Sequence, residues 1–159
     1  MSKFVIYLNL PLYKAEWLTH HLGNPVVFPA GSPQNATIRT FTQLLPKGME
    51  PETPGEGDVA IAIPDSKAKP PERFHYMGHR GKEAVKEAID DLFRRSLWND
   101  ISPLDTDEYP VGLNKLIAAW CEMHGIGLDR VETVRQCYAR IRAAFAKTGI
   151  NLRKSSRKK

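Results

Sequence analysis

The basic side chains of this chain are concentrated in its last thirty residues, where they could bind a polyanion. From Arg130 to Lys159 the sequence has ten lysines and arginines and a single acid, Glu132, which gives a local charge of +9. Residues 1–129 hold thirteen basic and seventeen acidic side chains, a balance of −4, so the whole chain carries +5. Lysine and arginine bind phosphate through charge and N–H donors, and clusters of them are typical of segments that contact nucleic acid.

The first part of this basic segment, Asp129–Lys147, has the apolar spacing of a helix. At about 100° per residue its apolar side chains lie on one side: Val131, Val134, Tyr138, Ile141 and Phe145. The opposite side carries polar and small side chains: Glu132, Gln136, Ala139, Arg140 and Ala143, with Arg135 and Arg142 on one flank and Arg130 on the other. Asp129 and Glu132 have the spacing of a capping box, and Gly149 is the expected stop.

This polar side could enter a nucleic-acid groove. Alanines allow close approach, arginine can donate two parallel hydrogen bonds to guanine or phosphate, and glutamine can read adenine. A second helix is predicted over residues 113–124, and a four-residue turn joins it to the last helix. The two helices together resemble the recognition unit of helix-turn-helix proteins. We therefore expect binding to DNA rather than RNA, through Arg130, Arg135, Gln136, Arg140, Arg142 and Lys147.

Residues 151–159 are expected to form a disordered basic tail. Its five cations would hold the phosphate backbone without sequence preference and make binding depend steeply on salt: Arg153, Lys154, Arg157, Lys158 and Lys159. The turn before the last helix, Met123–Gly127, is similar to the phosphate-binding hairpin of helix-hairpin-helix modules. That similarity covers about nine residues, with His124 where the family has proline and Val131 where it favours alanine.

Patterns that would indicate catalysis are weak. His75 and His79 would share a strand face but stand too far apart for one metal ion. The run from Asp58 to Asp65-Ser66-Lys67 resembles half of a restriction-type nuclease site, but a proline interrupts the strand before the second carboxylate. Loops that bind nucleotide phosphates and nucleophile elbows do not occur. We therefore expect no enzyme, catalytic residue, metal or cofactor, and a metal-dependent nuclease is only the third alternative.

The first eighty residues predict an α+β unit with a small mixed sheet. Strands are expected over residues 3–10, 25–29, 58–63 and 73–77, and helices over 12–22 and from Ser32-Pro33 to Leu45. The β-branched run at 37–40 competes for a strand within the second of these helices. This unit would serve as a scaffold or as a surface for a protein partner.

After Gly81 the pattern becomes helical, with helices expected over residues 82–98, 113–124 and 129–147. The predicted domains are thus an α+β scaffold at 1–80, a three-helix module at 81–150 and the tail at 151–159. The predicted fold class is α+β: a small N-terminal mixed sheet with two helices, followed by a helix-turn-helix-like module and a disordered basic tail.

Composition sets the remaining expectations. The chain is 42% hydrophobic and 26% charged, which is typical of a folded protein. It has no signal-peptide pattern and no apolar run near the length of about 20 residues that crosses a bilayer. We therefore expect a cytoplasmic protein without membrane contact. Cys121 and Cys137 lie in helical patterns and indicate neither a disulfide nor a zinc site.

The alternative function is an interaction or assembly protein whose basic tail docks an acidic partner. In that case Arg135 and Arg142 should pair with Glu87, Asp90 or Asp91 of the helix at 82–98, and the last helix would have a structural role without a binding surface. A regulator of symmetric DNA sites would be a homodimer. No residue pattern identifies a dimer surface.

Overall fold

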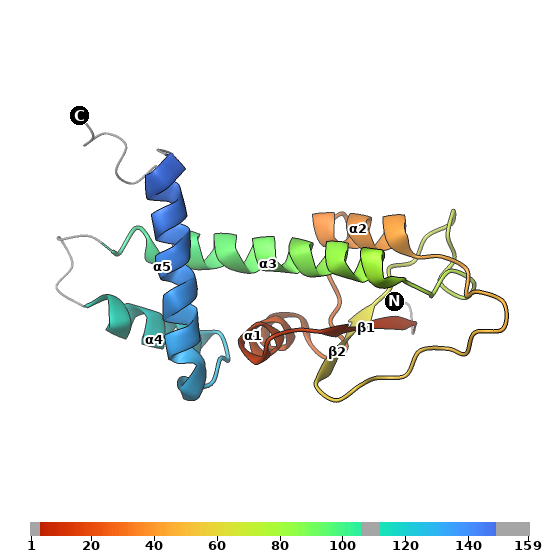
Figure 1. Cartoon of the computed structure of the whole chain (residues 1–159), viewed down its shortest axis with the longest axis horizontal. Coiled ribbons are helices and arrows are strands. Elements are labelled where there is room, and N and C mark those ends of the chain that lie inside the picture. Colours follow the sequence, from red (N-terminus) through yellow and green to blue (C-terminus); the bar gives the residue numbers. More distant parts are fainter. Residues whose placement is uncertain (1–3, 106–111, 149–159) are drawn as a thin grey trace. The chain divides into compact units, whose positions relative to one another are not determined.

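The computed structural model describes residues 4–105 and 112–148, and the chain divides into two compact units, Met1–Asp90 and Asp91–Lys159. Its helices are α1 (Leu12–Leu22), α2 (Pro33–Phe41), α3 (His79–Ile101), α4 (Leu113–Met123) and α5 (Val131–Thr148), with a 3-10 turn, η1 (Leu128–Arg130), directly before α5 (Figure 1). The strands are β1 (Val5–Asn9) and β2 (Asp58–Ala62). The predicted α+β class is confirmed. α3 contributes its residues up to Asp90 to the first unit and the rest to the second.

The sheet of the first unit is an antiparallel pair of strands. β1 and β2 pair from Val5 opposite Ala62 to Asn9 opposite Asp58. Their buried positions face each other directly: Ile6 opposite Ile61 and Leu8 opposite Val59. These apolar pairs fix the register, because a slip of one residue would turn every side chain to the other face.

The predicted strand at 25–29 is reduced to one residue. Val26 pairs in parallel with Ile61: its N–H donates to the carbonyl of Ala60 at 2.8 Å, and its carbonyl accepts from Ala62 at 2.8 Å. The prediction of a full strand was wrong because the prolines at both ends of this segment have no N–H to extend the ladder. The bridge nevertheless gives β2 a parallel neighbour as well as an antiparallel one.

The predicted strand at 73–77 is also a single bridge. Arg73 and Phe74 donate their N–H groups to the carbonyl of Pro70 in a turn, at 3.0 and 2.8 Å. Tyr76 exchanges two backbone hydrogen bonds with Gln43. The alternation of aromatic residues predicted a strand, but the turn uses the N–H groups that a ladder would need.

α2 begins where predicted but ends at Phe41, four residues before the expected Leu45. At the start, the Ser32 hydroxyl accepts from the N–H of Asn35 at 3.2 Å, as the N-cap pattern predicts. At the end, Thr42 is extended and Gln43 enters the bridge, so the helix cannot continue to Leu45. The Lys69 ammonium then donates to three carbonyl oxygens at this C-terminus: Arg39 at 3.0 Å, Thr40 at 3.1 Å and Thr42 at 3.0 Å.

Replacing Lys69 by methionine should destabilise the first unit. The substitution keeps the length of the side chain but removes the cation and the three hydrogen bonds at the negative end of the α2 dipole, and we expect a loss of about 1–2 kcal/mol in the free energy of unfolding. Urea unfolding followed by circular dichroism measures it. Lys67→Met, at an exposed lysine two residues away, is the matched control and should change nothing. An equal effect of both substitutions would contradict this role for Lys69.

Gly81 is packed so closely in α3 that it has no room for a side chain. A Cβ atom there would lie 2.7 Å from Cγ of Met77 and 2.8 Å from Cβ of Phe41. Gly81→Ala should therefore destabilise the protein by about 1–3 kcal/mol, although helix propensity alone would favour alanine by about 1 kcal/mol. The sign of the change in unfolding free energy is the test, and a stabilised variant would contradict the close packing.

The second unit has an aromatic core shared by three helices. Its buried side chains are Phe93, Leu97, Trp98 and Ile101 of α3, Ile117, Trp120 and Cys121 of α4, Ile126 of the turn, and Val134, Tyr138 and Ile141 of α5. The ring of Trp98 stacks on Tyr138 at 5.6 Å and on Phe145 at 4.8 Å between centroids. Both cysteines are free thiols, and burial raises the pKa of Cys121 to about 11. Within the described residues, no helix is both long and apolar enough to cross a membrane.

Candidate nucleic-acid interface

α4 and α5 are joined by a tight turn that ends α4 and redirects the chain (Figure 1). His124 caps α4, and Gly125 has φ 77°, a left-handed conformation that favours glycine. Ile126 follows, only 3% exposed, and its N–H donates to the carbonyl of Cys121 at 2.9 Å. The turn is therefore anchored in the core of the second unit, which fixes the point at which α5 begins.

The first turn of α5 differs from the predicted capping box. Gly127 is the residue before η1, so Asp129 lies within the helical segment and not in front of it. Its carboxylate pairs with Arg130 at 2.8 Å, while Glu132 pairs with Arg135. The prediction was wrong because the 3-10 turn starts the helix two residues earlier.

These contacts also bear on the similarity to helix-hairpin-helix modules. The N–H of Gly125 donates to Glu122 at 3.4 Å and that of Ile126 to Cys121, so both are already used within the protein. The carboxylate of Asp129 stands at the start of the helix, where it already occupies the guanidinium of Arg130. The contacts do not favour a phosphate-binding turn.

The outward side of α5 is polar, small and basic. We define the outer face as six exposed residues, each three or four positions from another member of the set: Glu132, Gln136, Ala139, Arg140, Ala143 and Lys147. The apolar side predicted for this helix is the side that packs in the core, with Val134, Tyr138 and Ile141 buried. The cations Arg140 and Lys147 are exposed, and neither forms an ion pair within the described part of the chain.

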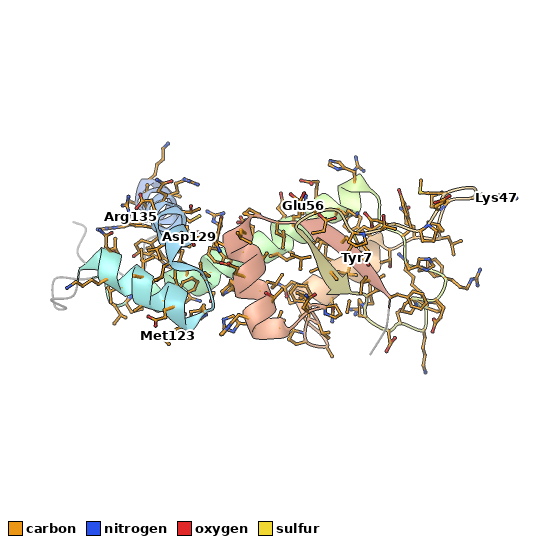
Figure 2. The ribbon with its side chains drawn as sticks, turned by 90° about the horizontal axis from the view of Figure 1, so that it is seen from below. Tyr7, Lys47, Glu56, Met123, Asp129 and Arg135 are labelled. Carbon is orange, nitrogen blue, oxygen red and sulfur yellow. The ribbon has the colours of Figure 1, made fainter. Side chains whose placement is uncertain are left out.

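The acid on the outer face, Glu132, is hydrogen-bonded to two neighbours and forms an ion pair with one of them. Arg135 donates twice to the Glu132 carboxylate, from Nε to Oε1 at 2.9 Å and from Nη2 to Oε2. The amide Nε2 of Gln136 lies 3.3 Å from the same Oε2. The hydrogen bonds from Arg135 hold the pKa of Glu132 below its usual value, and those to Glu132 raise the pKa of Arg135. Figure 2 shows Arg135 on the outside of α5.

Arg130 and Arg142, like Arg135, form ion pairs within the protein. Nη1 of Arg142 lies 3.3 Å from Oδ2 of Asp105, and the same oxygen accepts from the buried Tyr138 hydroxyl at 2.9 Å. Arg130 pairs with Asp129 at the turn. The structure therefore brings Gln136, Arg140 and Lys147 together on the outer face, with Arg135 beside them. Five further predicted contacts lie outside the described residues: Arg153, Lys154, Arg157, Lys158 and Lys159.

Sequence reasoning missed the carboxylates that hold the helices of this unit. Asp105 follows α3, and its carboxylate contacts Tyr138 and Arg142 of α5. Asp100, near the end of α3, accepts from the indole N–H of Trp120 at 2.8 Å and lies 3.8 Å from Nε2 of His124. The acidic composition of residues 99–112 was the available signal, but composition does not say which acid meets which partner.

The enzymatic patterns do not assemble into a site. Asp58 begins β2 and accepts from the N–H of Gly55 at 2.8 Å, whereas Asp65 comes after the end of the same strand. His75 stacks on Phe4, with ring centroids 5.2 Å apart. Among residues 4–105 and 112–148, no group of three or more histidine, cysteine or acidic side chains could hold a metal ion. The convergence that a metal-dependent nuclease would need is not observed.

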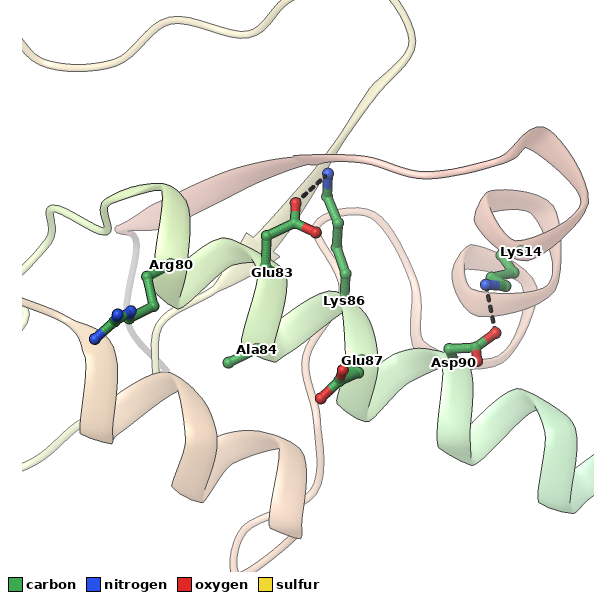
Figure 3. A pocket seen from close by; sticks show the side chains of 7 residues that line it. All are labelled: Lys14, Arg80, Glu83, Ala84, Lys86, Glu87 and Asp90. Atoms are coloured by element: carbon green, nitrogen blue, oxygen red, sulfur yellow. Dashed lines mark hydrogen bonds and ion pairs between the residues drawn. The ribbon is translucent and has the colours of Figure 1, made fainter.

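A shallow pocket in the first unit is lined by charges of both signs (Figure 3). Lys14 of α1 pairs with Asp90 of α3, and Lys86 pairs with Glu83 at 3.3 Å. Arg80 and Glu87 complete three cations and three carboxylates around it. Because these charges balance, the pocket favours neither an anion nor a cation.

The chain was compared with protein-family models, curated protein sequences and solved structures, and none of the three comparisons gives a match.

Proposed function

We propose that this protein binds duplex DNA through the outer face of α5, with the basic segment after residue 150 holding the phosphate backbone. The observation that carries the proposal is the surface of α5. It presents Arg140 and Lys147 without ion-pair partners in the described part of the chain, with the exposed Ala143 between them and the exposed Ala139 directly before Arg140. Small side chains between cations allow a helix to lie deep in a groove while the cations reach phosphates.

The distribution of charge supports a polyanionic partner for the second unit. Met1–Asp90 contains ten basic and ten acidic side chains, a balance of zero. Asp91–Lys159 contains thirteen basic and eight acidic side chains, which accounts for the entire charge of +5. A field from one unit steers a polyanion toward that unit and raises the association rate.

The placement of the aromatic side chains favours a duplex over a single strand. Proteins that bind single-stranded nucleic acid stack bases on exposed aromatic rings. Among the residues that the structure describes, every phenylalanine, tyrosine and tryptophan is buried or half-buried. Groove and phosphate contacts need no such rings, so they fit the observed surface better.

Fluorescence anisotropy of a labelled 30-base-pair duplex, titrated at several salt concentrations, tests the proposal. The full chain is compared with a variant in which the five basic residues after 150 are replaced by glutamine. We expect log Kd to vary linearly with log salt, with a slope of about 0.9 for each phosphate contact, and we expect the variant to bind more weakly but measurably. Absence of binding by the full chain, or complete loss in the variant, would contradict a role for α5.

One observation favours a protein partner as the second candidate function. Met123 and Leu128, on either side of the α4–α5 turn, are 73% and 75% exposed. Large apolar side chains on a surface often mark contact sites. If the duplex does not bind, we propose that the protein docks an acidic partner protein that also covers these two side chains.

A further inference from the structure

Glu132 holds the guanidinium of Arg135 in a fixed plane at the first turn of α5. The guanidinium has five N–H donors, and the two bonds to Glu132 use Nε–H and one hydrogen of Nη2. Three donors remain, and two of them, one on each terminal nitrogen, point in parallel away from the side-chain stem. This is the edge that donates to O6 and N7 of guanine.

The pair also explains why a carboxylate stands on a surface that should meet DNA. An isolated Glu132 would repel phosphates, and its side chain is 62% exposed. The carboxylate stays charged, but the guanidinium of Arg135 beside it offsets that charge, and the bonds to Arg135 and Gln136 restrict the rotamers of both neighbours. A restricted arginine loses less conformational entropy when it binds a base.

The position of Arg135 suits a reading role. In helix-turn-helix proteins, residues near the N-terminus of the second helix contact base edges. Arg135 lies in the second turn of the helical segment that starts with η1, and the next residue on its side of the surface, Ala139, is small and exposed. An alanine there leaves space for the edge of a base pair beside the guanidinium.

We infer that Arg135 reads a guanine in the major groove of duplex DNA and that Glu132 is its positioning residue. This inference rests on the proposed function and adds sequence preference to it. Arg140 and Lys147 would contact phosphates and contribute affinity without preference.

Selection from a library of random 20-base-pair duplexes, using the full chain, tests the inference. The enriched duplex is then remade with 7-deazaguanine, which lacks the N7 acceptor, at each guanine in turn. For the wild-type protein we expect one position at which replacement weakens binding about tenfold. Arg135→Lys and Glu132→Gln should bind the original duplex about tenfold more weakly and respond little to 7-deazaguanine there, with an unchanged salt slope. Asp91→Asn breaks a similar exposed pair, with Arg95 on α3, and should retain the full preference.

Each result has a separate meaning. Duplex binding without enrichment of any sequence would overturn the inference and leave the proposed function intact. A preference that survives Glu132→Gln unchanged would overturn the role of Glu132, and one that survives Arg135→Lys would overturn that of Arg135. No binding to the library at any salt concentration would overturn the proposed function as well.

Discussion

Reversing the charges of Arg140 and Lys147 to glutamate is expected to weaken duplex binding about 100-fold at about 150 mM salt. Each substitution removes one cation from the outer face and places a carboxylate near a phosphate, so two contacts become repulsive. Both side chains are exposed and form no ion pair in the described part of the chain, so the fold should be unaffected. The slope of log Kd against log salt should decrease by about two, because each lost phosphate contact reduces this slope by about one.

Anisotropy titration of the same duplex measures this effect, and circular dichroism checks that the variant is folded. The control is Arg95→Glu with Lys115→Glu, which changes the net charge equally at exposed positions on α3 and α4 of the second unit and also removes the ion pair of Arg95 with Asp91. If net charge alone drives binding, both double variants will weaken it equally. That result would contradict the assignment of the binding surface to α5.

Replacing Asp105 by alanine is expected to lower the free energy of unfolding of the second unit by about 2–3 kcal/mol. The carboxylate is only 15% exposed, and it receives the hydroxyl of the fully buried Tyr138 and the guanidinium of Arg142. Alanine removes both contacts at once, and the buried hydroxyl of Tyr138 is left without its acceptor. Asp105, which positions α5, thus lies 33 residues before Tyr138 in the sequence.

Urea unfolding followed by tryptophan fluorescence reports mainly on this unit, because Trp98 and Trp120 lie in its core and only Trp17 lies in the first unit. Asp105→Asn is the informative control, since the amide oxygen can still accept from Tyr138 while the ion pair with Arg142 is lost. We expect this variant to lose less than half as much stability as Asp105→Ala. Equal destabilisation would show that the charge and not the buried hydroxyl dominates, and an unchanged midpoint for both would contradict the role of Asp105.

Local patterns predicted the helices well. The bounds of α1 agree with the expected Leu12–Leu22, and the apolar and polar sides of α5 are those that helical periodicity predicts. The pair between Glu132 and Arg135 is of the same kind, because residues three apart on a helix are neighbours. These features depend on residues within a few positions of one another.

Features that depend on distant residues could not be predicted in this way. Whether residues 25–29 extend a sheet depends on the N–H groups that face β2, and Val26 alone supplies one. The contact between Asp105 and Tyr138 joins residues 33 positions apart. Arg142 was expected to contact DNA because of its position on the flank of the helix. That position does not reveal that the carboxylate of Asp105, which follows α3, lies beside it.

The most direct test of the central claim is a titration of the isotope-labelled full chain with duplex DNA, followed by two-dimensional NMR of the backbone amides. We predict that the largest shifts among the residues described by the structure cluster on the outer face of α5 and at Arg135, with the β1–β2 sheet unaffected. Shifts confined to the residues after Gly149, or centred on the first unit, would contradict the claim that α5 is the DNA-binding surface.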